Sequence, residues 1–204
     1  MVLYTGNATD DVDISHSLSA VPHLIIVKNR DNSNNESWAV YHHKNTSAPE
    51  TDFLKIDTTA ATGDSDEIWS DEPPTSSVFT IGRQDMVNTS GGNHIAYLWS
   101  EKQGFSKFGS YTANNDADGA FIYLGFRPEL FICKKYSGTE SWYANDSKRS
   151  TYNPTKAEIY LDGNSAEDTA STRIDLLSNG VKMRTDNGGY NYGSETYVYM
   201  AWAE

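Results

Sequence analysis

Cysteine, long apolar runs and a leader-like N-terminus are missing or nearly so from this sequence. Its 204 residues include one cysteine, Cys133, which excludes an intramolecular disulfide and a metal-binding cysteine pair. No segment reaches the length of a membrane span, and the N-terminus lacks the basic and apolar regions of a signal peptide. We therefore expect no membrane insertion. If the protein works outside the cell, we expect it to leave by another route, such as assembly into a particle freed by lysis.

Basic residues are scarce as well. Lysine and arginine total 16 against 28 aspartates and glutamates, which gives a formal net charge of −12 and a sequence pI near 4.7. A surface of that sign repels phosphate backbones and anionic lipids, so nucleic-acid and membrane partners are not expected. The acidity fits ordinary solubility and also adaptation to salty water, and both interpretations stay open at this point.

Helical periodicity is a third absence. No stretch carries sustained 3.6-residue periodicity with helix caps, so we expect little helix beyond single turns at residues 50–52 and 166–168. Aromatic and turn-forming residues are abundant instead: 13 Tyr, 7 Phe and 5 Trp occur among many Thr, Ser, Asn, Asp and Gly. Aromatic and β-branched residues favour strands, whereas Asn, Asp, Gly and Ser favour turns. The composition therefore predicts an all-β protein.

The sequence is repeated along its length. Residues 21–28 return as residues 127–134, which is 106 positions later, and residues 94–101 return as residues 197–204 at an offset of 103. Matches in one order with nearly constant offsets indicate a duplication, and the repeat is too long for a solenoid unit. Further matches join Glu36-Ser37-Trp38 to Glu140-Ser141-Trp142 and residues 3–7 to residues 110–114.

The repeat divides the chain into a first half at residues 1–104 and a second half at residues 105–204. Residues 101–109, which join them, lack the composition of a flexible tether, so we expect the halves to pack together as one globular unit. The predicted fold is an antiparallel β-sandwich, jelly-roll or lectin-like, built from two pseudo-symmetric internal repeats. In the first half we expect strands at residues 3–5, 23–29, 38–42, 53–57, 77–81 and 94–101, and a hairpin turn at residues 31–35.

Two oxygen-rich loops and a histidine pair raise the question of a metal site. Residues 10–13 and 114–119 hold several Asp and Asn at matching places in the two halves, a composition that suits Ca²⁺ but is also typical of turns. The spacing of an EF-hand loop is absent from both. His42 and His43 are adjacent in a predicted strand, so their side chains point to opposite faces and do not share one metal ion. We expect no metal and no cofactor.

Catalytic motifs are lacking too. The sequence contains no Gly-x-Ser-x-Gly elbow, and the order of its Ser, His and Asp residues supports no triad. A polysaccharide-cleaving enzyme needs two carboxyl groups at a set separation across a groove. Glu36 and Glu140 recur in the two halves, as do Glu101 and Glu204, which indicates a structural role. The chain is therefore expected not to be an enzyme.

Aromatic residues supply the candidates for recognition. Trp99 and Trp202 lie at matching places in apolar strands, which predicts core packing. Trp69, Tyr190 and Tyr192 have no such counterpart and lie in polar segments. Sugar rings stack on flat aromatic faces while amides bind their hydroxyls, so Trp69, Tyr190, Asn191 and Tyr192 are the predicted glycan-binding residues. Hairpin packing and a subunit interface are the alternatives for these side chains.

With these residues in view, the chain resembles a module common in marine bacteriophage tail and virion proteins. The resemblance covers nearly the whole chain in order, and its motifs are specific as a series but weak singly. It implies a domain found near the ends of tail fibres and similar appendages, and it brings no catalytic residues. The segments that carry it are residues 21–30, 38–42, 74–82, 104–112 and 199–204.

The expected function follows from the fold and this resemblance. We expect a non-enzymatic bacteriophage virion module, part of a tail fibre, with a structural role and adhesion to host-surface glycan. Its partners would be other virion subunits and copies of itself in a trimer, since fibres are usually trimeric and weak contacts then add by avidity. The alternatives are a polysaccharide-processing tailspike domain, which would be an enzyme, and a capsid-decorating or spacer module without a ligand.

Overall fold

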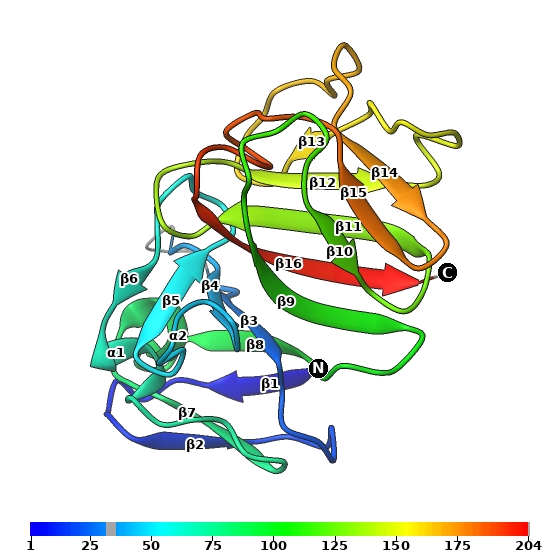
Figure 1. Cartoon of the computed structure of the whole chain (residues 1–204). Helices are drawn as coiled ribbons and strands as arrows, with labels where there is room; N and C mark the ends of the chain where they lie inside the picture. The colour runs from blue at the N-terminus through cyan, green and yellow to red at the C-terminus, as the bar shows by residue number, and fades with distance from the viewer. Residues whose placement is uncertain (32–35, 204) are drawn as a thin grey trace. The chain divides into compact units, whose positions relative to one another are not determined.

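The computed structural model describes residues 1–31 and 36–203, and the chain is mostly strand (Figure 1). About 40% of the residues lie in strands and 4% in helices, which confirms the all-β prediction. The chain forms two compact units, Met1–Ser100 and Glu101–Glu204, each with its own sheets and its own core. The division falls four residues before the predicted boundary. Packing of the two halves into one globular unit stays a prediction.

Unit 1 contains a large sheet in the order β1-β8-β3-β4-β5-β6 and a small sheet formed by β2 and β7, with every pairing antiparallel. Two helices of one turn each, α1 (Asp66–Trp69) and α2 (Asp85–Asn88), lie in the connections. The strands are β1 (Val2–Thr5), β2 (Val12–Ser15), β3 (Leu24–Asn29), β4 (Ala39–His42), β5 (Asp52–Lys55), β6 (Gly63–Asp64), β7 (Val78–Ile81) and β8 (Asn93–Trp99).

The core of unit 1 lies between its two sheets. Ile25 and Val27 of β3 are almost fully buried and belong to one cluster with Phe79 and Ile81 of β7. These residues alternate along their strands, because successive side chains point to opposite faces of a sheet. Trp69 of α1 lies in the same cluster. Burial of a large apolar side chain contributes roughly 1.5–3 kcal/mol, so this cluster is the main source of stability for unit 1.

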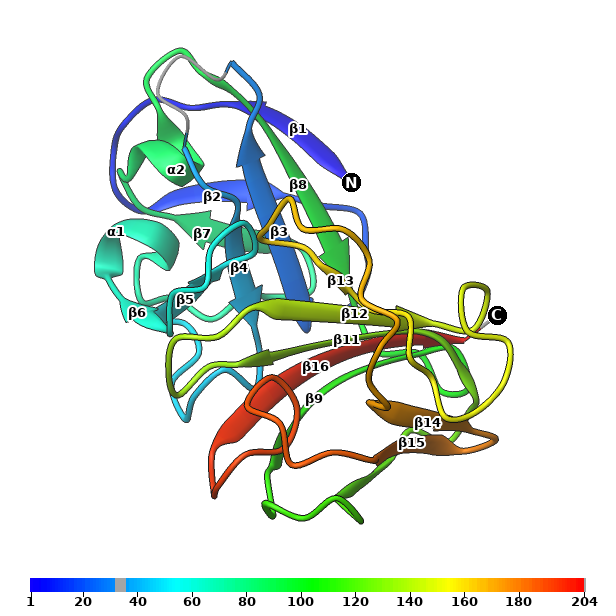
Figure 2. The same ribbon diagram turned by 90° about the horizontal axis from the view of Figure 1, so that it is seen from above.

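Unit 2 contains a large sheet in the order β13-β12-β11-β16-β9 and a small sheet in the order β10-β15-β14, again antiparallel. Figures 1 and 2 show the small sheet as a second layer beside the large one. The strands are β9 (Ser106–Thr112), β10 (Phe121–Tyr123), β11 (Pro128–Lys135), β12 (Trp142–Asp146), β13 (Ile159–Tyr160), β14 (Ile174–Leu177), β15 (Gly180–Met183) and β16 (Thr196–Ala203).

The core of unit 2 fills the space between these two layers. Phe131 and Cys133 of β11 meet Ile122 of β10, Leu176 of β14 and Val181 of β15 in one buried cluster. The predicted role of Cys133 as a small core residue is confirmed. The inner face of the small sheet is therefore apolar. The residues on its outer face do not belong to this core cluster.

The two units share a strand order when their strands are matched through the sequence repeat. The order β1-β8-β3-β4-β5 of unit 1 corresponds to β9-β16-β11-β12-β13 of unit 2. Individual hydrogen bonds correspond as well: the Tyr4 hydroxyl donates to Val87 O at 2.7 Å, and the Tyr111 hydroxyl donates to Tyr190 O at 2.8 Å. Tyr190 thus takes the place of Val87. Duplication as the origin of this likeness stays a prediction from the sequence.

Two local predictions differ from the structure. Residues 166–168 are not helical, because Asp168 instead forms an antiparallel bridge with Glu158, whose N–H donates to Asp168 O at 2.9 Å. Glu50 and Thr51 form a turn and Asp52 begins β5, so the predicted helical turn at residues 50–52 is wrong. The predicted hairpin turn at residues 31–35 lies largely outside the described residues.

The tryptophans of the repeat differ in burial. Trp142 is fully buried, but Trp99 and Trp202 are only half-buried, so the prediction that both lie in the core is wrong. Both side chains are on the face of the large sheet opposite the core cluster, because their neighbours Leu98 and Ala201 point into it. Trp202 instead meets Phe108 edge-on, with ring centroids 5.4 Å apart.

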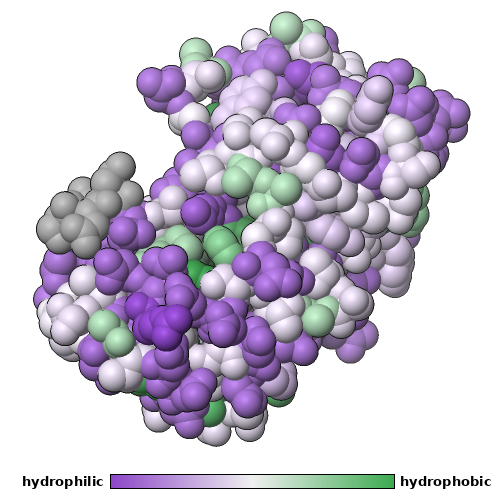
Figure 3. All heavy atoms as spheres, turned by 90° about the vertical axis from the view of Figure 1, so that its left-hand side faces the viewer, coloured by the Kyte–Doolittle hydropathy of each residue, from purple (hydrophilic) through white to green (hydrophobic). Residues whose placement is uncertain are grey.

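Hydrophilic side chains prevail on the face seen in Figure 3, with apolar residues in small patches, as the composition leads one to expect. Among the helices of the described part of the chain, none is long and apolar enough to cross a membrane.

Candidate ligand-binding face

Trp69, the first predicted glycan-binding residue, is buried. It ends helix α1, is 2% exposed and meets the Tyr41 ring edge-on with the centroids 6.0 Å apart. The polar residues before it belong to the start of the helix, where the Ser65 hydroxyl accepts a hydrogen bond from Glu67 N–H. The expectation of an exposed Trp69 ring in a polar loop is therefore wrong.

Tyr190 is also buried, within a polar network of unit 2. Its side chain is fully covered, and its hydroxyl lies 2.7 Å from both Asn145 Oδ1 and Glu158 Oε2. Burial raises the pKa of Tyr190 well above its usual range. The ring packs against Tyr143 with a centroid separation of 4.9 Å. No face of this ring is available to a sugar, so the predicted role fails for lack of exposure.

The carboxylate at the centre of this network is fully engaged by protein groups. Glu158 is fully buried and accepts hydrogen bonds from Arg173 Nε and Nη2, both at 2.9 Å, and from the Tyr160 hydroxyl at 3.1 Å. Bidentate pairs of this kind are strong, and a buried charge requires them. The network is therefore a structural element that fixes the segment around β13 against the loop containing Tyr190.

Asn191 holds a loop in place and has a counterpart in unit 1. Its Oδ1 accepts from Asn114 N–H at 3.0 Å, and its Nδ2 donates to Asp116 O at 2.8 Å. Asn88 makes the same pair of contacts with Asn7 N–H at 2.8 Å and with a backbone oxygen two residues further on at 2.7 Å. Both amides are fully buried, so the prediction that Asn191 is exposed to a ligand is wrong. We call these contacts the asparagine latches.

Tyr192 is the one predicted residue whose ring reaches solvent. It is 57% exposed, and its backbone N–H donates to the Tyr197 hydroxyl at 3.3 Å. The following residue, Gly193, has a φ of +60° and donates to Asn115 Oδ1 at 2.9 Å, which fixes the turn. Glycan contact at Tyr192 stays a prediction. The structure does not join it to the other three side chains in one site.

A different group of exposed aromatic residues lies on β10. Phe121 is 45% exposed and Tyr123 is 61% exposed, whereas Ile122 between them points into the core. In register, Phe121 lies opposite Lys182 of β15, and Lys182 lies opposite Asp175 of β14. Directly paired residues point to the same side of a sheet. We define the small-sheet face as this outer side of the sheet, formed by Phe121, Tyr123, Leu177, Gly180, Lys182 and Asp175, of which Gly180 is buried and Asp175 is only 6% exposed.

The two rings of the small-sheet face are held in place by their neighbours. A Cβ added at Gly180 would come within 2.9 Å of Phe121 Cε2 and Cζ, so the Phe121 ring lies across a strand position that has no side chain. Lys107 Nζ lies 5.4 Å from the centroid of the Tyr123 ring and donates to Tyr123 O at 2.7 Å. Each ring is thus supported on one side and open to solvent elsewhere.

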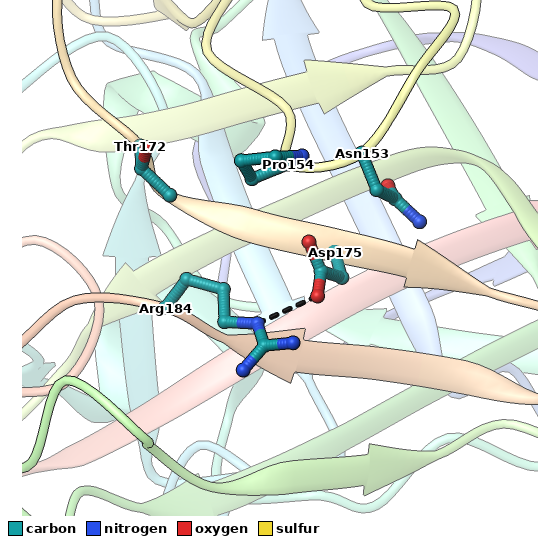
Figure 4. A pocket seen from close by; sticks show the side chains of 5 residues that line it. All are labelled: Asn153, Pro154, Thr172, Asp175 and Arg184. Atoms are coloured by element: carbon teal, nitrogen blue, oxygen red, sulfur yellow. Dashed lines mark hydrogen bonds and ion pairs between the residues drawn. The ribbon is translucent and has the colours of Figure 1, made fainter.

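A hollow of about 460 Å³ adjoins this face (Figure 4). Asp175 and Arg184 form its polar wall, with Arg184 Nε 2.6 Å from Asp175 Oδ2. Asn153 and Pro154 enter from the loop before β13, and the Asn153 amide exchanges hydrogen bonds of 3.0 and 2.9 Å with the backbone of Leu176. These bonds fix the loop to the edge of β14 and hold that side of the hollow in place. Thr172 completes the lining.

Positive and negative groups balance on the small-sheet face. Lys182 Nζ lies 3.0 Å from Asp118 Oδ1, and Arg184 lies between Asp118, at 3.5 Å, and Asp175. The hydrogen bond from Lys182 and its charge hold the pKa of the Asp118 carboxyl below its usual range. Two cations therefore meet two carboxylates here, on a chain whose formal net charge is −12.

The corresponding face of unit 1 has different chemistry. Asp13 and Ser15 of β2 lie opposite Thr80 and Val78 of β7, in the register positions that Phe121 and Tyr123 occupy in unit 2. A hollow of about 510 Å³ beside them is lined by carboxylates and hydroxyls, and no described aromatic residue lines it. The aromatic surface is thus a property of unit 2.

The oxygen-rich loops are tied to basic residues in both units. Asp10 Oδ2 of the first loop lies 3.2 Å from Arg83 Nη1, and Asp118 of the second loop is paired with Lys182. Within residues 1–31 and 36–203, no three His, Cys, Asp or Glu side chains gather as a metal site would require. The two ion pairs connect each loop to a basic residue elsewhere in its unit.

The arrangement suits recognition of a molecule with both apolar and hydroxylated faces. Exposed rings offer stacking, and the neighbouring carboxylates and guanidinium offer hydrogen bonds with fixed directions. The sequence prediction missed this face because Phe121-Ile122-Tyr123 resembles an ordinary buried strand. Comparison of the two halves would have found it, since rings stand at Phe121 and Tyr123 where the first half has Asp13 and Ser15.

Comparisons with known proteins add a family and no function. The family model for a domain of unknown function, DUF7483, matches residues 1–204. No curated protein matches the chain. No solved structure matches it.

Proposed function

Since the chain belongs to the DUF7483 family along its whole length, a family without an assigned function, we propose from its own geometry that it is a non-enzymatic adhesion module that binds glycan. The small-sheet face of unit 2 is the proposed contact surface. The proposed setting is a bacteriophage virion, as part of a tail fibre, where the module would bind a host-surface glycan and also serve as a structural subunit.

The observation that carries the proposal is the pair of exposed rings beside a polar hollow. Phe121 and Tyr123 lie on one short strand, and Asp175 and Arg184 line the hollow across the same sheet. A pyranose has an apolar C–H face and equatorial hydroxyls. A surface with exposed aromatic rings beside polar groups can therefore contact both parts of the sugar. Tyr supplies contact area at a low cost in conformational entropy, and the planar guanidinium of Arg loses less entropy per hydrogen bond than a lysine ammonium does.

The state of the carboxyl groups favours binding over hydrolysis. Glycosidases need a protonated carboxyl group with a raised pKa opposite a second carboxylate. Asp118 has its pKa shifted downward by Lys182, and Asp175 is held by Arg184. A carboxylate with a lowered pKa, such as that of Asp118, accepts hydrogen bonds from hydroxyls and does not donate a proton at neutral pH.

The virion setting rests on the sequence resemblance to phage tail and virion modules. Trimeric fibres would present several copies of the face toward one surface, so weak individual contacts would add by avidity, by roughly 10²–10⁴-fold in favourable geometry. A shallow open face is sufficient for such a mode of attachment.

Attachment of the purified, fluorescently labelled protein to candidate host bacteria tests the proposal. We expect saturable binding that purified surface polysaccharide competes away. The double variant Phe121→Ala/Tyr123→Ala should reduce attachment at least about tenfold, which corresponds to about 1.4 kcal/mol. Its melting temperature should remain close to that of the parent protein, because both rings are exposed.

The matched control is Asp13→Ala/Ser15→Ala, which changes the corresponding positions of unit 1. This variant should attach as the parent protein does. Equal attachment by the aromatic double variant and the parent would contradict adhesion through the small-sheet face, and would favour the role of a spacer without a ligand.

A further inference from the structure

We propose that the small-sheet face binds a neutral oligosaccharide of at least two sugar units, an inference that rests on the proposed glycan adhesion. One unit stacks on the β10 rings, and the next reaches the hollow beside β14. This inference names the size and the charge class of the ligand, neither of which follows from adhesion itself.

The size follows from the register of the three strands. Phe121, Lys182 and Asp175 lie directly opposite one another across β10, β15 and β14. Neighbouring strands are about 4.8 Å apart, so the backbones of Phe121 and Asp175 are separated by roughly 10 Å. A single pyranose stacked on Phe121 does not also fill the hollow at Asp175, whereas a linked pair reaches both.

The surface between the two ends is formed by the Phe121 ring and the middle strand β15. Gly180 of β15 has no side chain, and the Phe121 ring fills that space, so the stacking surface extends from β10 over β15. Lys182 is drawn toward the β9–β10 connection, where Nζ donates to Gly119 O at 2.5 Å. Its ammonium group is thereby held at the edge of the face and not over its centre.

The charge class follows from the pairing of the ionic groups. Arg184 contacts Asp175 and Asp118, and Lys182 contacts Asp118, so the cations at the hollow are already neutralised by protein carboxylates. An anionic sugar would have to displace one of these carboxylates, whereas sugar hydroxyls can donate to Asp175 and accept from Arg184 while the pair stays intact. A neutral oligosaccharide is therefore favoured over a uronic or sulfated one.

Titration calorimetry with sugars of defined length tests both parts. The probes are cello- and manno-oligosaccharides of one to four units, and oligogalacturonates of the same lengths as the anionic comparison. We expect the affinity for at least one neutral series to rise about tenfold or more from one unit to two or three, and the anionic series to bind more weakly.

Two variants locate the effect. Phe121→Ala removes the stacking surface, and Asp175→Asn preserves shape but removes the charge that the hollow presents to hydroxyls. Each should reduce the gain from the second sugar unit to less than about threefold, with thermal unfolding checked in parallel. Ser15→Ala in unit 1 is the matched control and should leave the binding isotherms unchanged.

Each alternative result has a separate meaning. Equal affinity for one and two units, or tighter binding of oligogalacturonates, overturns this inference and leaves glycan adhesion standing. If no probe binds and Phe121→Ala still attaches to cells, both the inference and the proposed function of this face are overturned. If no probe binds but Phe121→Ala abolishes attachment, the inference of a neutral oligosaccharide fails while adhesion through the face survives.

Discussion

At the scale of single residues, the environment of an aromatic ring matters more than the polarity of its sequence neighbours. Tyr190 and Tyr192 are two positions apart, yet Tyr190 is fully buried in the network with Glu158 and Tyr192 is 57% exposed. Phe121 and Tyr123 come from an apolar run and are nevertheless exposed. Exposure of a ring is set by the alternation of its strand and by the hydrogen bonds that its hydroxyl finds.

Trp142→Ala should destabilise the protein far more than Tyr192→Ala. Trp142 is fully buried, so truncation leaves a cavity, and large-to-small changes of this kind cost about 3–5 kcal/mol. Tyr192 is mostly exposed, and its truncation should change the free energy of unfolding by no more than about 0.5 kcal/mol. Urea denaturation measures both values. Equal midpoints for the two variants would contradict the assignment of inside and outside.

The pKa of Asp118 supplies a prediction on pH. Lys182 lowers this pKa in the folded protein, so the pair contributes stability above the unfolded value of about 3.9 and loses it as the pH falls through the folded value. Lys182→Met should raise the pKa of Asp118 toward its ordinary value in a carboxyl NMR titration from pH 2 to 6. Lys107→Met, which removes a lysine that contacts Tyr123 instead, should leave the titration curve of Asp118 unchanged.

At the scale of elements, the asparagine latches tie the connection between the first two strands of each unit to a later segment, which is the end of α2 in unit 1 and the loop before β16 in unit 2. Asn88 fixes the segment after β1, and Asn191 fixes the segment after β9. Each amide satisfies backbone groups of a connection that lies outside the sheet ladders, as buried amides generally must. The same device thus positions the small-sheet strand that follows in both units.

Asn191→Ala should lower the free energy of unfolding by about 1–3 kcal/mol, because it leaves the backbone groups of residues 114 and 116 without their buried partner. Hydrogen exchange should accelerate at Asn114 while Asn7, held by Asn88 in unit 1, stays protected. Asn88→Ala should give the reverse pattern. Acceleration at both sites in either variant would show that the latches are not local to their units.

The elements differ in how well the sequence predicts them. Alternation and the repeat suffice for β3, β4 and β8, whose predicted ranges overlap the observed ones. The small-sheet strands β10, β14 and β15 were not predicted, because they are short and because β10 pairs with β15 from a distant part of the sequence, although β14 and β15 form a tight hairpin. Helix α1 was missed for a related reason: its four residues are too few to show a period.

The candidate site was harder to predict than the fold. Trp69 is preceded by Ser65, Asp66 and Glu67, which suggest a polar loop, but these residues begin a helix whose last residue is buried. The small-sheet face depends on pairing across three strands, and Asp175 and Phe121 are 54 residues apart in the chain. Such a juxtaposition follows from topology and has no local signal in composition or spacing.

At the scale of the whole molecule, two units with matching strand orders carry unlike outer faces. The small-sheet face of unit 2 has two rings and balanced charges, whereas the corresponding surface of unit 1 has Asp13 and Ser15 beside a hollow with further carboxylates. The core and the latches are shared features, and the rings are not. Recognition is therefore expected in one unit alone.

One chain should bind one oligosaccharide. Calorimetric titration with the best neutral probe should give a stoichiometry near one per chain, and a trimer would hold three. Light scattering on the same sample gives the number of chains, which makes the two measurements comparable. A stoichiometry near two would contradict the division of roles between the units and would place a second site in unit 1.

The balanced charges of the small-sheet face also affect the kinetics of attachment. The contact surface is close to neutral, but the chain around it has a formal net charge of −12 and would be repelled by a negatively charged cell envelope. That repulsion reaches about 30 Å in 0.01 M salt and about 10 Å in 0.1 M salt. Added salt should therefore raise the association rate with the cell while the dissociation rate stays constant. Attachment is then expected to be tighter at high salt concentration.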